Sequence, residues 1–415
     1  MRFDTPPPMD DFSDRDDDDD IPGDLDDDIE IIEDYEDSDV DSDDVDSDGA
    51  EAGGGDAHFP PPSRNDAKIT FQNHDQAVFS CDVNVTNTYV VSGGEDDRAF
   101  VWNLTNGEVL FECTGHKDSV TCVGFNYDSS LVATGDMSGC IKVWYVSSMS
   151  TVWEFETSDL RWLHWHPLAN VLFAGTSDGN AWLWKIPSGE CKTFQSFGAE
   201  CSSGRILPDG KRAITSYEDG TFRIWDLKSA TVIHSVAGSA THSSTIITLD
   251  CTSTGDLVAT GSTDGLTRLT NLNSGKVVAT FSVSNSDRRI DPDDTELDNS
   301  DSIESVAFAP GSPNLLAVGS LNGNLYIWDV PTQTERHVCR HPGGIVKLLW
   351  NGQHHVITVC LDGVVRAWDA RSGQLAKSWE GHMAEILDVA LSPDGKTIVT
   401  ASEDCTCAVY KDLPE

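Results

Sequence analysis

From residue 67 onwards, the chain consists of short runs that are either wholly apolar or alternate between apolar and polar positions. The first group comprises Val78–Val83, Tyr89–Ser92, Ala99–Trp102 and Val109–Glu112, followed by the Gly115–His116 pair. Runs of this length and composition are typical of β-strands. The pattern therefore predicts successive units of four short strands.

A pair of positions six residues apart recurs through the whole of this region. The first position is a turn residue, usually Asp, and the second is usually Trp. The pairs are Asp96–Trp102, Ser138–Trp144, Asp178–Trp184, Asp219–Trp225, Asp264–Thr270, Asn322–Trp328, Asp362–Trp368 and Asp404–Tyr410. Their second positions are 42, 40, 41, 45, 58, 40 and 42 residues apart. This is the period of WD40 repeats, each of which forms one four-stranded blade. We therefore predict an all-β fold, an eight-bladed WD40 β-propeller over residues 67–415.

Histidines follow a second periodicity that agrees with the first. His74, His116, His242 and His382 each lie 28 residues before the second position of the pair in the same repeat, and His341 lies 27 residues before Trp368. In a WD40 blade this His joins a Ser or Thr, the turn Asp and the Trp in a buried, hydrogen-bonded relay. The best predicted relays are His74, Ser92, Asp96 and Trp102, and His341, Thr358, Asp362 and Trp368. We expect these residues to be structural, because orphaning one buried partner costs about 1–3 kcal/mol.

The two ends of the repeat region predict how the ring closes. Ala67–Gln72 is one spare strand before the first blade, and the last repeat ends after its third strand near Leu413. A propeller leaves no exposed long edge. The closing strand 67–72 is therefore expected to complete the eighth blade. The one long interval contains 284–302, which we interpret as an acidic insertion between blades.

Charge distinguishes the N-terminal segment from the repeats. The chain has 27 Lys+Arg and 70 Asp+Glu, for a net charge of −43, and residues 1–56 alone hold 26 acidic and 2 basic residues. Such a segment buries too little apolar area to fold, so we predict a disordered acidic tail over 1–66. Ser38, Ser42 and Ser47 each precede Asp and are candidate phosphorylation sites. The tail is either a solubilising segment or a competitor for the surface that binds a basic client.

The repeats are acidic as well, because residues 57–415 carry 44 acidic and 25 basic residues. Binding to nucleic acid or to an anionic membrane needs clustered Lys and Arg, so we expect no direct nucleic acid and no membrane partner. A basic protein or peptide is the natural complement. The eleven cysteines form no CxxC pair, and no signal peptide is recognisable, which predicts a cytoplasmic protein that could also enter the nucleus.

Catalytic motifs are missing from the sequence. It contains no GxxxxGK[ST], no GxGxxG after a strand, no HExxH and no GxSxG. The close pairs His164/His166 and His354/His355 have no further ligands at metal-binding spacing. We therefore expect no enzyme activity, no cofactor and no metal.

We name the four strands of each blade a to d in chain order. One face of the predicted ring is then formed by the loops between strand d of one blade and strand a of the next, together with the loops between strands b and c. By register, these loops carry carboxylates that we predict to bind a partner. They are Glu95, Asp97, Asp118, Asp136, Asp159, Glu218, Glu385 and Glu403. Trp162, Phe79 and Tyr217 are expected near the same mouth. Carboxylates beside aromatic rings suit a Lys/Arg-rich peptide. Acidic loops on any soluble acidic protein are the alternative interpretation.

Several segments, taken together, resemble one family. Gly93–Trp102, Gly115–Cys122, Ala133–Gly139, Trp162–Pro167 and Leu207–Ala213 are similar to the angio-associated migratory cell protein family, and the resemblance covers 67–413. For fungal members the resemblance implies a chaperone that escorts a basic large-subunit ribosomal protein in ribosome assembly. For vertebrate members it implies a cytoplasmic adaptor in small-GTPase signalling, cell migration and angiogenesis. The acidic face favours the first role, for a monomeric protein-binding scaffold.

Overall fold

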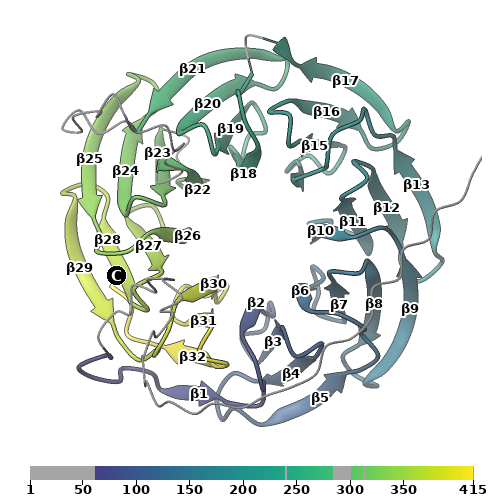
Figure 1. Cartoon of the computed structure of the whole chain (residues 1–415), viewed down its shortest axis with the longest axis vertical. Coiled ribbons are helices and arrows are strands. Elements are labelled where there is room, and N and C mark those ends of the chain that lie inside the picture. The colour runs from purple at the N-terminus through teal and green to yellow at the C-terminus, as the bar shows by residue number, and fades with distance from the viewer. Residues whose placement is uncertain (1–60, 239–240, 284–300, 312–313, 415) are drawn as a thin grey trace, which may run out of the picture. The chain divides into compact units, whose positions relative to one another are not determined.

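Eight four-stranded antiparallel sheets surround a central axis in the computed structural model, which describes residues 61–238, 241–283, 301–311 and 314–414 (Figure 1). Each sheet is one blade of a β-propeller, and the described residues contain 32 strands and no α-helix. The predicted fold class is confirmed.

The strands of the first four blades follow the chain in order. Blade 1 contains β2 (Val78–Val83), β3 (Tyr89–Gly94), β4 (Ala99–Asn103) and β5 (Val109–Cys113). Blade 2 contains β6 (Val120–Phe125), β7 (Leu131–Asp136), β8 (Cys140–Tyr145) and β9 (Ser150–Glu156). Blade 3 contains β10 (Leu160–Trp165), β11 (Val171–Thr176), β12 (Ala181–Lys185) and β13 (Glu190–Phe194). Blade 4 contains β14 (Ser203–Ile206), β15 (Arg212–Ser216), β16 (Phe222–Asp226) and β17 (Thr231–Val236).

The next three blades repeat this order, and the last one takes its outer strand from the start of the chain. Blade 5 contains β18 (Ile246–Cys251), β19 (Leu257–Ser262), β20 (Leu266–Asn271) and β21 (Lys276–Ser282). Blade 6 contains β22 (Ile303–Phe308), β23 (Leu315–Ser320), β24 (Asn324–Asp329) and β25 (Thr334–Arg340). Blade 7 contains β26 (Ile345–Asn351), β27 (His355–Cys360), β28 (Val365–Asp369) and β29 (Gln374–Trp379). Blade 8 contains β30 (Ile386–Leu391), β31 (Ile398–Ser402), β32 (Cys407–Tyr410) and β1 (Ile69–Phe71).

Ring closure joins β1 to β32 in antiparallel register, with Ile69 opposite Val409 and Phe71 opposite Cys407. Packing adds to these hydrogen bonds, because the Phe71 ring stacks on Trp102 of blade 1 with centroids 4.6 Å apart and planes 5° apart. β1 therefore contacts both neighbours, and the strand expected over 67–72 forms at its centre.

Residues 63–66 differ from the expectation of a tail that extends to residue 66. The Ser63 amide donates to Glu380 Oε2 at 3.0 Å, Arg64 Nη2 donates to the Ser378 carbonyl at 3.0 Å, and the Asp66 amide donates to the Glu380 carbonyl at 2.7 Å. These contacts attach the segment to blade 7. The rest of the predicted tail, with Ser38, Ser42 and Ser47, lies outside the described residues, as does the predicted insertion except for residues 301 and 302.

Candidate protein-binding face

The predicted relay of blade 1 is present in the structure. His74 Nδ1 lies 3.0 Å from Asp96 Oδ1, and His74 Nε2 lies 2.9 Å from Ser92 Oγ. Trp102 Nε1 donates to the same Ser92 oxygen at 3.2 Å. Burial alone would raise the pKa of Asp96, but hydrogen bonding and the charge of His74 outweigh it and lower that pKa. Blades 5 and 8 contain the same His–Thr and His–Asp contacts, with His242, Thr260 and Asp264 and with His382, Thr400 and Asp404.

Asp136 belongs to the relay of blade 2 and is not a partner-binding carboxylate. Its side chain is fully buried (0% exposed), because His116 Nδ1 contacts one oxygen at 2.9 Å, and the Cys140 amide and the Ser138 hydroxyl donate to the other. The relay continues through Thr134 to Trp144. The expectation was wrong because the repeat alignment placed Ser138 at the turn position, whereas the Asp lies 20 residues after His116 and not 22.

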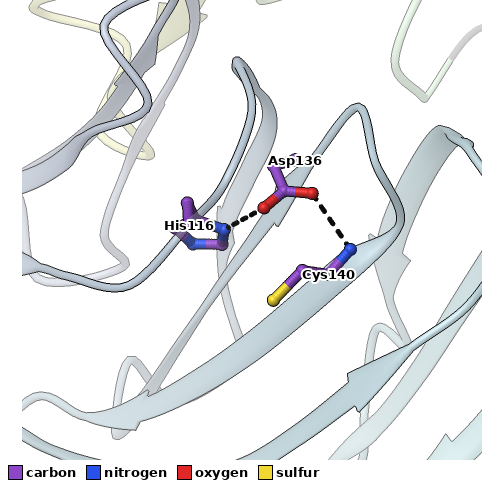
Figure 2. Close-up of side chains that lie close together, drawn as sticks. All are labelled: His116, Asp136 and Cys140. Carbon is purple, nitrogen blue, oxygen red and sulfur yellow. Dashed lines mark hydrogen bonds and ion pairs between the residues drawn. The ribbon is translucent and has the colours of Figure 1, made fainter.

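His116, Asp136 and Cys140 also bring three potential metal-ligand atoms within 4.8 Å of one another (Figure 2). Both nitrogens of His116 and both oxygens of Asp136 already have hydrogen-bond partners. Burial raises the pKa of the Cys140 thiol, which disfavours the thiolate that binds metals. The cluster therefore fits a hydrogen-bonded turn and does not fit a metal centre.

Blade 7 contains a relay without its Asp, which corrects the predicted set of His341, Thr358, Asp362 and Trp368. His341 Nδ1 donates to the Gly323 carbonyl at 3.0 Å, and His341 Nε2 lies 2.8 Å from Thr358 Oγ1 and accepts from Trp368 Nε1 at 3.0 Å. Asp362 instead pairs with Arg366, at 2.6 Å from Nη2. His341 lies one residue closer to Asp362 than His74 does to Asp96, and Arg366 of β28 binds the Asp362 carboxylate. Both differences explain why Asp362 does not join the relay. Burial, with the charge of Arg366, lowers the pKa of His341 to about 4.

The blades that lack the relay histidine compensate to different extents. In blade 4, Trp225 Nε1 donates to Thr215 Oγ1 at 2.7 Å, and the Tyr217 hydroxyl lies 2.9 Å from the same oxygen, where the other blades have a His nitrogen. In blades 3 and 6, Ala174 and Val318 occupy the Ser/Thr position. Among the described residues, Trp184 Nε1 and Trp328 Nε1 are consequently buried without a hydrogen-bond partner.

Polar side chains also close the inner edges of neighbouring blades. Asp388 of β30 accepts from the Cys81 amide at 2.9 Å, and Asp82 of β2 accepts from the Phe125 amide at 2.8 Å. Asp388 also pairs with Lys347 of β26. Burial raises the pKa of Asp82 to about 6. Asp82 and Asp388 thus satisfy backbone amides of the neighbouring blade's inner strand.

One hydrogen bond repeats in all eight blades and defines the face that carries the predicted carboxylates. In each blade a backbone amide of the b–c loop donates to a carbonyl of the d–a loop. Examples are Glu95 N to Ala77 O at 2.8 Å, Glu218 N to Glu200 O at 3.0 Å, and Glu403 N to Glu385 O at 3.0 Å. Equivalent bonds tie Ser177 to Asp159 and Met137 to Ser119. The two sets of loops are therefore held together at one end of every blade.

Seven of the eight predicted carboxylates remain at the surface of this face. Glu95, Asp97, Asp159, Glu218 and Glu403 are exposed, whereas Asp118 and Glu385 are half-buried. We call these seven residues the acidic face. Within the described part of the chain, no ion pair involves the side chains of Glu95, Asp97, Asp159 or Glu218. Four carboxylates of one face are thus free to meet an external cation.

The register of the aromatic residues was predicted less well. Trp162 and Tyr217 are buried, and Phe79 is half-buried, so Trp162 and Tyr217 are not available at the mouth. Two further residues of these loops, Glu200 and Phe197, were not among the predicted site residues. Glu200 pairs with Arg161 at 2.7 Å, and Phe197 is exposed. The signal for Phe197 is its position, 28 residues before Trp225, where other blades have the relay His.

The two faces of the ring differ in how many basic residues their loops contain. The b–c loops contain many carboxylates and a single basic residue, Arg98. In contrast, the a–b and c–d loops interleave basic residues with their carboxylates. Those basic residues are Lys211, Lys228, Arg371 and Lys396, and Lys411 directly follows β32 at the same end. The described d–a loops on the same face as the b–c loops add one further basic residue, Lys117, so carboxylates predominate at that end of the ring.

Comparisons with known proteins agree with this architecture. The WD domain, G-beta repeat, matches residues 66–103, 107–145 and 191–226, and the N-terminal domain of the nucleolar protein 10-like family matches residues 216–411. The human angio-associated migratory cell protein is 50% identical over 348 residues, which cover 83% of this chain and 80% of that protein. The chain belongs to the angio-associated migratory cell protein family.

Fungal proteins share the fold of this family member at lower identity. The Saccharomyces cerevisiae ribosome assembly protein SQT1 is 24% identical over 84% of this chain and 87% of its own length. The crystal structure of Chaetomium thermophilum Sqt1 bound to the N-terminus of the ribosomal protein L10 has a TM-score of 0.75 and 23% identity, covering 84% of this chain and 100% of that one. The family member described here is a WD40 scaffold for protein binding. Within the described residues, no helix is long and apolar enough to cross a membrane.

Proposed function

We propose that this protein escorts a basic large-subunit ribosomal protein, and that the acidic face binds a Lys/Arg-rich segment of that client. The observation that carries the proposal is the set of four exposed carboxylates, Glu95, Asp97, Asp159 and Glu218, that have no ion-pair partner among the described residues. They lie on rigid loops, because each loop pair is tied by the repeated backbone hydrogen bond.

The chemistry of these groups suits capture followed by release. Carboxylates form charge-assisted hydrogen bonds with guanidinium and ammonium groups, and those bonds are stronger than neutral ones. Complementary charge speeds encounter, and salt weakens it, so a client can be bound quickly and handed on. The similarity to Sqt1, whose crystal structure contains the N-terminus of a ribosomal protein, supports the same type of client here.

A signalling adaptor is the second candidate function. The 50% identity to the human angio-associated migratory cell protein favours it, since an adaptor in cell migration needs only a rigid scaffold with several binding surfaces. The two functions differ in what they require of the acidic face. The escort depends on it, whereas the adaptor does not. In either role we place a monomeric protein in the cytoplasm, with access to the nucleus and without direct binding to nucleic acid.

Affinity purification from translating cells separates the two functions. The intact protein is compared with a variant in which Glu95, Asp97, Asp159 and Glu218 are all changed to Lys, at two salt concentrations. The escort function predicts one dominant, near-stoichiometric ribosomal protein that is lost in the variant and at high salt. Recovery of signalling or cytoskeletal proteins, equally with both proteins, would support the adaptor and contradict the escort.

A further inference from the structure

In blade 4, Phe197 stands at the position that the relay His occupies in other blades, but it takes no part in the hydrogen-bonded relay. It lies in the loop between β13 and β14, 28 residues before Trp225, where blades 1, 2, 5 and 8 have the relay His. The Tyr217 hydroxyl contacts Thr215 in place of that His. The relay of blade 4 therefore takes no hydrogen bond from position 197. The Phe197 ring lies 6.4 Å from the ring of Trp225, and its side chain is 60% exposed.

The exposed Phe197 ring packs against the buried side chain of Arg223. The Arg223 guanidinium carbon lies 3.9 Å from the centre of the Phe197 ring and 4.4 Å from the centre of the Tyr217 ring. Arg223 is only 8% exposed, and its Nη1 has no hydrogen-bond partner within the described chain. The loop is fixed as well, since the Ser196 amide donates to Asn180 Oδ1 at 2.9 Å. Phe197 thus presents one ring face to solvent from a defined position.

The charges around Phe197 determine which side chain its free face prefers. Glu200 and Asp159 lie in the d–a loops of blades 4 and 3, and Glu218 lies in the b–c loop tied to Glu200. Glu200 is already paired with Arg161 at 2.7 Å, so Asp159 and Glu218 are the carboxylates that attract a basic segment to the site. Directly against the ring, however, the Arg223 charge repels a second cation, whereas a neutral aromatic ring meets no such penalty. Exposed aromatic residues in well-supported positions dominate the affinity of many interfaces.

We propose that Phe197 is the anchor of the acidic face and binds an aromatic side chain within the basic client segment. This inference rests on the proposed function and adds a specificity to it. The carboxylates supply attraction that depends on charge alone, and Phe197 distinguishes between basic segments that contain an aromatic residue at the right place and those that do not.

Two fluorescent peptides of equal charge test the inference with the full-length protein. One alternates arginine and serine, and the other has a tyrosine in place of its central serine. The wild-type protein is expected to bind the tyrosine peptide about 3- to 10-fold more tightly, as ring stacking allows. Phe197→Ala should abolish this preference and bind the serine peptide within about twofold of wild type, because stacking and not charge is removed. Phe197→Trp should retain the preference.

Leu168→Ala is the matched control, because Leu168 is 71% exposed in a loop on the opposite face. It should leave the preference intact. A tyrosine preference that persists in Phe197→Ala, or that is missing from the wild-type protein, would overturn the anchor. If the wild-type protein bound neither peptide, the proposed function itself would fail, which is a distinct result. Thermal melting of each variant verifies that the ring is folded.

Discussion

His341 must be neutral for the relay of blade 7 to form. Its Nε2 accepts a hydrogen bond from Trp368 Nε1, and its Nδ1 donates a hydrogen bond to the Gly323 carbonyl. A proton on Nε2 would face the indole N–H and remove the acceptor. Burial, with the charge of Arg366, lowers the pKa of His341 to about 4 from its ordinary value of 6.5.

This titration predicts how stability depends on pH. A His with a lowered pKa in the folded state binds a proton more readily when unfolded, so its contribution is complete above pH 6.5 and is lost as the pH falls towards 4. The loss is about 1.4 kcal/mol per pH unit, or about 2 kcal/mol between pH 6.5 and 5. We expect the difference in free energy of unfolding between wild type and His341→Gln to shrink by that amount. A difference that is constant from pH 7.5 to 5 would contradict a neutral relay His.

Val318→Thr is expected to stabilise blade 6. The side chain stands where Thr358 of blade 7 accepts from its Trp, and Trp328 Nε1 is buried without a partner in the described structure. A threonine of the same shape supplies the missing oxygen, and a hydrogen bond of this kind contributes about 0.5–1.5 kcal/mol. Denaturant unfolding measures the gain.

Val91→Thr is the control for this substitution. Val91 is fully buried beside Ser92, in a strand position that does not face the blade's Trp. The hydroxyl there should be unsatisfied and should destabilise the protein by about 1–3 kcal/mol. Equal effects of the two substitutions would show that the empty relay position of blade 6 is not the cause.

Side-chain roles were predictable from spacing only where the spacing was regular. The set of His74, Ser92, Asp96 and Trp102 has the common intervals and forms the expected bonds. Asp136 and Asp362 deviate by two residues and one residue in their distance from the His, and each has a different role from the one predicted. Competition for a carboxylate, such as that of Arg366 for Asp362, depends on neighbours in space that spacing does not reveal.

At the scale of elements, β1 is the strand on which closure of the ring depends. It is three residues long, yet it forms the outer edge of blade 8 and stacks Phe71 on Trp102 of blade 1. Phe71→Ala should cost about 3–5 kcal/mol, because a buried aromatic ring is removed between two blades. Deleting residues 67–72 should destabilise the whole ring, measured as a lower melting temperature.

Thr70→Ala is the comparison within the same strand. Thr70 is exposed, so its loss should change stability by less than about 0.5 kcal/mol. Unchanged melting after deletion of 67–72 would refute closure through β1.

The number of blades and the order of the strands followed from the repeat period, because each four-stranded unit has the same turn and Trp positions. The start of the packed chain did not follow. Residues 63–66 are as polar as a tail segment, but hydrogen bonds to Ser378 and Glu380, with an ion pair between Arg64 and Glu380, attach them to blade 7. Local composition therefore placed this boundary a few residues too late.

At the scale of the whole propeller, charge is divided unequally between the two ends of the ring. The b–c loops hold carboxylates with Arg98 as their one basic residue, whereas the opposite loops mix both signs. A uniform net charge would attract basic peptides to any surface. An asymmetric distribution directs them to one end, which is what an escort with a single client site needs.

The most direct test of this account is binding of an arginine-rich peptide to two variants with the same net charge. One reverses Glu95, Asp97, Asp159 and Glu218 to Lys on the acidic face. The other reverses Glu108, Glu190, Asp256 and Glu335, which are exposed near the opposite end of the blades. Fluorescence anisotropy at two salt concentrations measures both. We predict that the first variant loses binding and its salt dependence while the second retains them. Equal weakening in both variants would show that net charge alone attracts the peptide, and would contradict a dedicated acidic face.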